Sequence, residues 1–279
     1  MTALLLAAAS AAVYGSADYC GGVATRRANP ITVTVLSQLI SVPLVVVGAL
    51  LVTGTPTLTD LGWGALAGAA GLIGLVLLYR GLSRGAMAVV APTTAVTAAL
   101  VPLGVGLVLE RWPRPLALAG VVCAVIAIGF VSLAPNGDRS PVTSSLLASA
   151  VLAGVAFGVF FIALDRAGSG AGLWPLVAAR LTSVGLGTGL ALAVGVSLKA
   201  PTGSWRWITG AGVLDVTANG LYVFAAQLGA LAVIAPVASL YPASTVLLAL
   251  TIDRERVRPV QLVGLGLAAM ALVLVTGST

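Results

Sequence analysis

The pentapeptide Ala88–Pro92 (AVVAP) occurs again, almost unchanged, as Ala232–Pro236 (AVIAP), 144 residues further along the chain. Other positions keep the same spacing: Gly68 with Gly212, Gly85 with Gly229, Arg114-Pro115 with Arg258-Pro259, Leu118 with Leu262, and Gly120 with Gly264. A register held from residue 68 to residue 120 is hard to obtain by chance, even in a chain rich in Ala, Val and Gly. It indicates an internal duplication.

The composition indicates that lipid is the main solvent of this chain. Of its 279 residues, 59% are hydrophobic and only 8% are charged, whereas soluble domains have roughly a quarter charged residues. The net charge of +6 comes from charges that fall mostly between apolar runs, as at the flanks of membrane spans. Nucleic-acid binding would need these charges on one face, so we expect the bilayer, and no nucleic acid, as a partner.

Ten apolar segments are each close to the ~20 residues that cross a bilayer as a helix. They are residues 3–22, 30–52, 61–80, 85–108, 114–134, 143–165, 171–198, 206–226, 230–252 and 259–277. The linker 135–142 (PNGDRSPV) joins a first half, 1–134, to a second half, 143–279. Five spans per half place the second copy upside down in the membrane. The sequence therefore predicts an all-α polytopic membrane protein with ten transmembrane helices in two inverted five-helix repeats, an architecture usual in secondary transporters.

Motifs for enzyme chemistry are isolated and lack their context. The stretch Gly81–Gly85 (GLSRG) matches a nucleophile pattern, but that pattern needs a histidine base and the chain has none. Lys199 follows no phosphate-binding loop, so ATP binding is not expected. Cys20 and Cys123 lie in separate apolar segments and predict buried thiols, with no disulfide framework and no metal site. We expect no enzyme activity and no cofactor.

Polar side chains at membrane depth are the main candidates for a site. A charge at a helix centre costs ~2.5–3.5 kcal/mol on insertion scales, and Asp215 lies in the middle of its segment. Asn219 shares its helix face four residues later, and Arg180 lies within segment 171–198. These residues are predicted to line a central cavity that binds substrate or a proton. Alternatively, an Asp215–Arg180 pair only fixes helix packing.

Three further residues on these helices have two interpretations. Asp18 lies four residues from the end of the first segment, where it either joins the cavity or pairs with Arg26 or Arg27. Tyr14 is one turn before Asp18, and Tyr222 is three residues after Asn219. Both tyrosines are candidate cavity residues. Interface anchoring explains most aromatic and amide groups near span ends equally well, namely Tyr14, Tyr79, Tyr222, Tyr241, Trp174 and Gln227.

Prolines and glycines punctuate the corresponding segments of both halves. Pro92 and Pro102 lie in the fourth segment, and Pro236 and Pro242 lie in the ninth. A proline removes a helical hydrogen bond, so these four positions are predicted helix breaks at a gate; the alternative is kinking for packing alone. Closely spaced glycines are expected to let helices approach one another: Gly68, Gly71 and Gly74 in segment three, and Gly185, Gly187 and Gly189 in segment seven.

The ends of the two repeats resemble the EamA-type proteins of the drug/metabolite transporter superfamily. Leu109-Glu110-Arg111 before Gly120, and Arg254-Glu255-Arg256 before Gly264, resemble the family's Gly-Glu-Arg turn and last helix. Tyr14-Gly15-Ser16 resembles the signature of its first helix. The arginine often found in the second helix is here Gln38, and its counterpart Arg180 remains. The resemblance covers the whole chain and adds Gln38 to the candidate cavity residues.

Together these features predict a secondary transporter that exports a small metabolite or drug-like solute by alternating access. We expect a multi-pass protein of the cell membrane, with Asp215 as the preferred carrier if a proton is coupled. A membrane sensor or scaffold without transport is the alternative function. The orientation has two answers: ten of the Lys and Arg residues fall in odd-numbered loops and three in even-numbered ones, which favours external termini, whereas the resemblance implies cytoplasmic termini.

Overall fold

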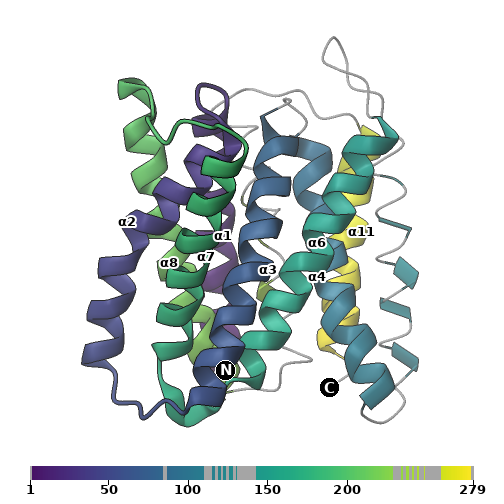
Figure 1. The fold of residues 1–279 in the computed structure, drawn as a ribbon. Coiled ribbons are helices and arrows are strands. Elements are labelled where there is room, and N and C mark those ends of the chain that lie inside the picture. The colour runs from purple at the N-terminus through teal and green to yellow at the C-terminus, as the bar shows by residue number, and fades with distance from the viewer. Residues whose placement is uncertain are drawn as a thin grey trace.

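The computed structural model describes residues 2–83, 87–109, 143–228 and 259–277, with isolated residues between 115 and 130 and between 234 and 248. In the first half its helices are α1 (Thr2–Thr25), α2 (Pro30–Leu51), α3 (Leu58–Leu82) and α4 (Met87–Leu109). In the second half they are α6 (Ser144–Arg166), α7 (Trp174–Ala193), α8 (Trp205–Leu228) and α11 (Pro259–Thr276), with 3-10 turns η1 (Ser169–Ala171) and η2 (Thr202–Ser204). Figure 1 shows these helices side by side in one bundle.

Eight of the ten predicted spans coincide with these helices. The other two, residues 114–134 and 230–252, fall largely outside the described residues, so the count of ten spans stays a prediction. The expected seventh span, 171–198, was too long, because α7 ends at Ala193. Gly195 takes a left-handed φ of 68°, and the Val196 N–H turns back to the Ala191 oxygen. A glycine in this conformation closes a helix C-terminus.

Local signals at the helix starts explain where the chain turns. The Asn29 side chain accepts a hydrogen bond from the Ile31 N–H, and Pro30 occupies the first helical position of α2. Thr57 and Asp60 form a capping box at the start of α3, and Thr143 caps α6 through the Leu146 N–H. These side chains bind the amide groups that a helix N-terminus leaves without partners.

The bundle has the dimensions and surface of a membrane protein. In the part of the chain that the structure describes, α2, α3, α6, α7 and α8 are long and apolar enough to cross a bilayer. Large apolar side chains such as Leu50, Ile73 and Leu152 project outward and are more than half exposed. An apolar exterior of this kind is expected where lipid tails, rather than water, surround the helices. The chain is therefore a multi-pass membrane protein.

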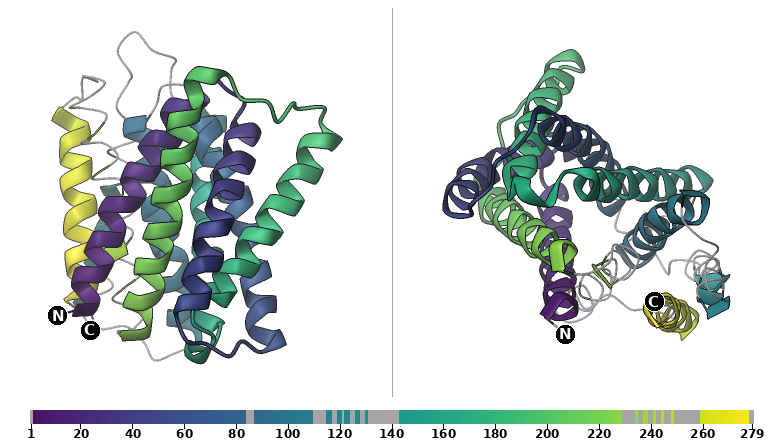
Figure 2. Two further views of the ribbon diagram at one scale, coloured as in Figure 1. Left: turned by 90° about the vertical axis from the view of Figure 1, so that its left-hand side faces the viewer. Right: turned by 90° about the horizontal axis from the view of Figure 1, so that it is seen from below.

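Helices of the two halves pack against each other in matching pairs. α1 packs on α8 and α3 packs on α6; likewise α2 packs on α8 and α3 packs on α7. Exchanging the halves replaces α1 by α6, α2 by α7 and α3 by α8. The α1–α8 contact then becomes the α6–α3 contact, and the α2–α8 contact becomes the α7–α3 contact. The first and sixth helices run in opposite directions, since the end of α1 lies beside the end of α3 at Gly21 and Tyr79, while the end of α6 meets the start of α3. Figure 2 shows both chain ends at one face of the bundle.

Glycines allow close helix crossings at related positions. A Cβ on Gly68 of α3 would lie 2.1 Å from the Ala179 oxygen of α7, and one on Gly212 of α8 would lie 2.3 Å from the Ser37 oxygen of α2. Gly71, Gly74 and Gly187 also contact neighbouring side chains. The expectation was wrong for Gly185 and Gly189, where a Cβ would meet no heavy atom within 4 Å. These two glycines face away from the neighbouring helices.

Candidate functional site

A cavity of ≈ 530 Å³, including its mouth, lies between six helices from both halves. α1, α2 and α3 form part of its wall, and α6, α7 and α8 form the rest. Its lining residues are Tyr14, Asp18, Gln38, Gly68, Gly71, Leu75, Phe157, Phe160, Phe161, Ala179, Arg180, Ser183, Asp215, Asn219 and Tyr241. Gly68 and Gly71 border the cavity where α3 comes close to the Ala179 backbone of α7 and to the Phe160 ring of α6.

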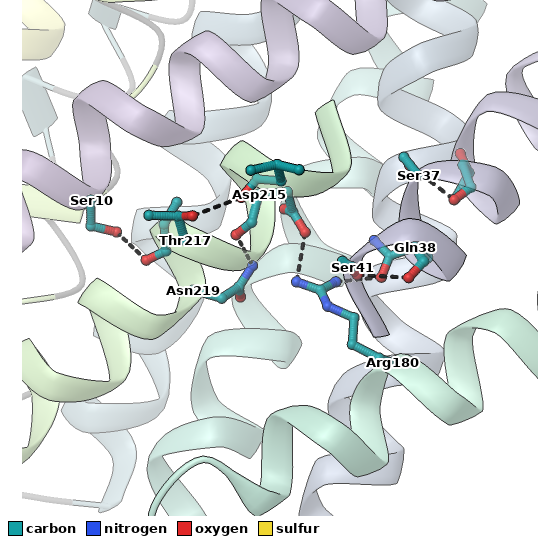
Figure 3. A network of polar contacts seen from close by, with 11 residues as sticks. Ser10, Ser37, Gln38, Ser41, Arg180, Asp215, Thr217 and Asn219 are labelled. Carbon is teal, nitrogen blue, oxygen red and sulfur yellow. Dashed lines mark hydrogen bonds and ion pairs between the residues drawn. The ribbon is translucent and has the colours of Figure 1, made fainter. Parts of the chain in front are cut away.

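Arg180 connects three helices at this cavity. Its Nη2 atom lies 2.6 Å from Asp215 Oδ2 on α8, forming an ion pair. Its Nη1 group donates a hydrogen bond to Gln38 Oε1 on α2. Figure 3 shows the guanidinium between these two partners. The Asp215–Arg180 pair considered in the sequence analysis is thus present, and both of its members line the cavity.

The same wall includes polar atoms that no described residue satisfies. Asn219 donates through Nδ2 to the Asp215 backbone oxygen at 2.7 Å, which leaves its Oδ1 atom without a partner among the described residues. Within that part of the chain, the Tyr14 hydroxyl, the Ser183 hydroxyl and Arg180 Nε are likewise buried and unpaired. Buried polar groups normally find partners. A cluster of such groups around a cavity therefore suits a polar ligand.

Asp18 projects from α1 into the cavity and is only 7% exposed. The two partners proposed from the sequence, Arg26 and Arg27, lie eight and nine residues further along the chain, beyond the buried end of α1. No hydrogen bond or ion pair joins Asp18 to any residue in the described ranges. Its carboxylate is therefore held at the cavity wall without a compensating cation from the described helices.

Aromatic rings also line the cavity. Phe160 and Phe161 of α6 pack edge to face with centroids 5.4 Å apart. Phe161 also meets the Tyr14 ring at 6.3 Å, and Tyr14 meets Tyr241 at 6.2 Å. Such edge contacts are favourable arrangements of aromatic side chains. The cavity consequently has a polar wall on α1, α7 and α8 and an aromatic wall on α6.

Six of the seven predicted cavity residues meet at this cavity: Tyr14, Asp18, Gln38, Arg180, Asp215 and Asn219. Tyr222 is not among its lining residues, and this expectation was wrong. The Tyr222 ring packs at 4.8 Å against Phe161 and borders a separate pocket near the end of α6. Tyr222 follows Asn219 by three residues, and a step of three residues along a helix turns the side chain by about 60°. The Tyr222 ring therefore points in a different direction from the Asn219 side chain and packs against Phe161.

Sequence reasoning missed several members of the wall. Ser183 follows Arg180 by three residues on the same helix, so helical spacing alone would have found it. Phe157 and Phe161 occupy the positions in the second half that match Tyr14 and Asp18, and the duplication was the available signal. Tyr241 was grouped with aromatic residues most of which interface anchoring would explain, but it is 4% exposed and lines the cavity. Interface anchoring is also wrong for Tyr79 and Tyr222, which are fully buried.

Two of the four predicted gate prolines lie within α4. This helix continues without interruption through Pro92 and Pro102, and Pro102 is not among the residues that line the cavity. Pro236 and Pro242 fall outside the described residues, as do Glu110 and Glu255. A gating role for the four prolines stays a prediction. Within the described ranges, no three His, Cys, Asp or Glu residues gather in a metal-binding arrangement.

Comparison with a solved structure identifies the fold. A crystal structure described only as "Crystal structure of protein" superposes with a TM-score of 0.70 at 15% sequence identity, over 98% of this chain and 97% of the other. At that identity the likeness concerns the fold alone. No curated protein sequence matches the chain.

The family comparison covers both halves. The family model described as "EamA-like transporter family" matches twice, over residues 1–133 and residues 144–277. Two matches in one chain agree with a duplicated architecture, and together they include every described helix that lines the cavity. By these matches, the chain belongs to the EamA-like transporter family.

Proposed function

We propose that this protein is a secondary transporter that exports a small metabolite or drug-like solute across the cell membrane by alternating access. The observation that supports this most directly is the cavity between the two halves, with an ion pair and unpaired polar groups in its wall. Polar groups inside a membrane protein are costly and usually functional. Binding sites between repeats are typical of secondary transporters.

The two halves are proposed to form an inverted repeat that moves around this cavity. The opposite directions of α1 and α6, and the exchangeable helix pairs, support that symmetry. In such a protein the two halves rock against each other and open the site to one face at a time. Segments 85–108 and 230–252 are the proposed gate, with Pro92 and Pro236 at related positions.

Coupling to a proton would act through Asp215. Protonation removes the charge of this carboxylate and therefore weakens its ion pair with Arg180, which joins α7 to α8. Because the same two residues line the cavity, proton binding and access to the site would be linked. Facilitated transport needs no such step. The two mechanisms differ in whether the flux depends on a pH gradient.

The test begins with an untargeted comparison of metabolites in cells with and without the protein. A solute depleted in producing cells and enriched in their medium is then used for counterflow in liposomes. We expect saturable flux that falls at least tenfold in Asp215→Asn and is unchanged in the control Asp165→Asn, an exposed carboxylate at the end of α6.

Three outcomes would contradict parts of the proposal. Flux unaltered by Asp215→Asn in rate and pH dependence would remove Asp215 as the carrier. Unchanged kinetics in Pro92→Ala combined with Pro236→Ala would reduce the prolines to packing. The absence of saturable counterflow for every enriched solute would favour a sensor or scaffold.

A further inference from the structure

The charges in the cavity wall do not balance. Among the described residues that line it are two acids, Asp18 and Asp215, and one base, Arg180. Arg180 is paired with Asp215 at 2.6 Å and is also hydrogen bonded to Gln38. This leaves the Asp18 carboxylate as the uncompensated charge. A buried carboxylate in this state is unfavourable unless a cation or a proton joins it.

Aromatic side chains of the same cavity also suit a cation. The Phe160 and Phe161 rings line the same cavity, and the Tyr14 ring lies one turn from Asp18 on α1. Aromatic faces attract ammonium groups within about 6 Å of their centroid, more strongly when water is excluded. The rings also offer apolar surface to the rest of a ligand.

Other charge types fit this wall less well. An anionic ligand would face Asp18 and would have to displace Asp215 or Gln38 to reach both Nη groups of Arg180. A zwitterion could place its carboxylate at Arg180 Nε and the Ser183 hydroxyl, which are unpaired among the described residues, but it adds no net charge and leaves the wall with one excess negative charge. A neutral ligand would leave the Asp18 carboxylate without a partner. A ligand with a single positive charge satisfies Asp18 without breaking a contact present in the wall.

We propose that the cavity selects a small organic cation, an ammonium group attached to an apolar body, with Asp18 as its counter-ion and the α6 rings around the body. This inference rests on the proposed transport function and specifies its substrate class. Tyr14 and Asn219 supply adjacent acceptor atoms, since the Tyr14 hydroxyl and Asn219 Oδ1 are unpaired among the described residues. Both lie within the same wall and can accept hydrogen bonds from an ammonium group.

The test uses four probes of one size that differ in charge: phenethylammonium, 2-phenylethanol, phenylacetate and phenylalanine. Their equilibrium binding to the purified full-length protein is measured by calorimetry and by ligand-induced thermal stabilisation. We expect phenethylammonium to bind at least tenfold more tightly than each of the other three. This comparison uses wild-type protein, so it does not depend on the folding of any variant.

Variants then assign the effect to one residue. Asp18→Asn keeps the size of the side chain and removes its charge, and we expect it to lower phenethylammonium affinity at least tenfold while leaving 2-phenylethanol binding unchanged. The matched control Asp165→Asn removes an exposed acid outside the cavity and should change neither affinity. Thermal unfolding of each variant, without ligand, reports whether it has folded.

The results separate this inference from the proposed function. Equal or weaker binding of the cation, or unchanged cation affinity in Asp18→Asn, overturns the cation site even if liposomes show flux of another solute. Cation binding that depends on Asp18, without flux of any bound cation, supports the site and contradicts transport. Preference for phenylalanine would assign the cavity to zwitterions and overturn the inference.

Discussion

Arg180 contacts two other helices, because one Nη group pairs with Asp215 on α8 and the other donates to Gln38 on α2. Its side chain is almost fully buried, so its charge is compensated by these neighbours rather than by water. A buried ion pair adds little net stability, but a buried charge that has lost its partner is strongly unfavourable. Removing one partner of the pair should therefore cost much more stability than removing both.

We expect Arg180→Gln to lower the free energy of unfolding by about 3 kcal/mol, because it leaves Asp215 in the cavity wall without its cation. Asp215→Asn should cost a similar amount for the reciprocal reason. The double variant Arg180→Gln with Asp215→Asn should recover most of the loss. Denaturant unfolding in detergent micelles measures all three, with the exposed Arg166→Gln of α6 as the control.

A double variant as unstable as the sum of the two single variants would show that the two side chains do not interact. Recovery of stability without recovery of solute flux would separate the two roles of the pair. In that case its contribution to packing would be replaceable by neutral side chains, and its charge would be required for transport.

At the scale of helices, the closest approaches are made through glycine. α3 crosses α7 at Gly68, and α8 crosses α2 at Gly212, with helix backbone directly opposite in both places. Backbone cannot move aside as a flexible side chain can. These crossings lie close to the Arg180–Asp215 ion pair in the chain, since Ala179 is adjacent to Arg180 and Gly212 precedes Asp215 on α8.

We expect Gly68→Ala to lower the free energy of unfolding by about 2 kcal/mol, because its Cβ would lie 2.1 Å from the Ala179 oxygen and would force α3 away from α7. Gly212→Ala should behave alike. The control Gly189→Ala on α7 meets no atom within 4 Å and should be neutral or stabilising by up to about 1 kcal/mol from helix propensity. Thermal unfolding compares them; equal stability of the three variants would contradict the crossings.

A second contact between elements joins the two halves at the face that contains the chain ends. Asp60 Oδ1 accepts a hydrogen bond of 2.7 Å from the Gly168 N–H beyond α6, and the Thr55 N–H donates to the Gly170 oxygen. The other Asp60 oxygen accepts from the Thr57 N–H and hydroxyl at 2.8 and 2.7 Å. One carboxylate thus both caps α3 and binds the loop before α7.

We expect Asp60→Asn to lower the free energy of unfolding, because an amide replaces a charged acceptor in the cap and in the interloop bond. Thr59→Ala, an exposed neighbour in the same turn, is the matched control. Limited proteolysis between residues 166 and 174 gives a second measurement, and faster cleavage in Asp60→Asn is expected. A variant as stable and as resistant as Thr59→Ala would show that this contact contributes nothing.

At the scale of the whole molecule, the described helices of the two halves begin at opposite faces of the bundle. α1 starts and α11 ends at one face of the bundle (Figure 2), while α6 starts at the opposite face. The five spans predicted before α6 would account for this change of face. The linker 135–142 directly precedes α6 in the sequence.

We expect a reporter fused after Thr279 and the same reporter inserted at Gly137 to lie on opposite sides of the membrane. Paired reporters, one active only in the cytoplasm and one only outside it, measure this. A cytoplasmic signal at Thr279 would agree with the family resemblance, and an external signal would agree with the positions of the Lys and Arg residues. Signals on the same side at both positions would contradict five spans in the second half.

The sequence by itself determined the class of the protein, the duplication and most of the helices. Twenty-residue apolar runs must be helical in lipid, and caps such as Asn29 and Thr57 mark where the helices begin. It also identified six residues that now line one cavity, because a polar side chain within an apolar run is conspicuous. The predicted end of the seventh span was wrong, because the backbone conformation of one residue, Gly195, ends α7 early.

Only the tertiary structure decided which residues face one another. Lipid tails are as apolar as leucine, so the lipid-facing and buried sides of these helices have similar compositions and no periodicity separates them. For that reason Gly189 and Tyr222 were assigned to the wrong surroundings, while Phe161 and Tyr241 were missed. Whether Arg180 pairs with Asp215 and leaves Asp18 uncompensated depends on how α1, α7 and α8 are rotated, and that rotation is set by packing across the two halves of the chain.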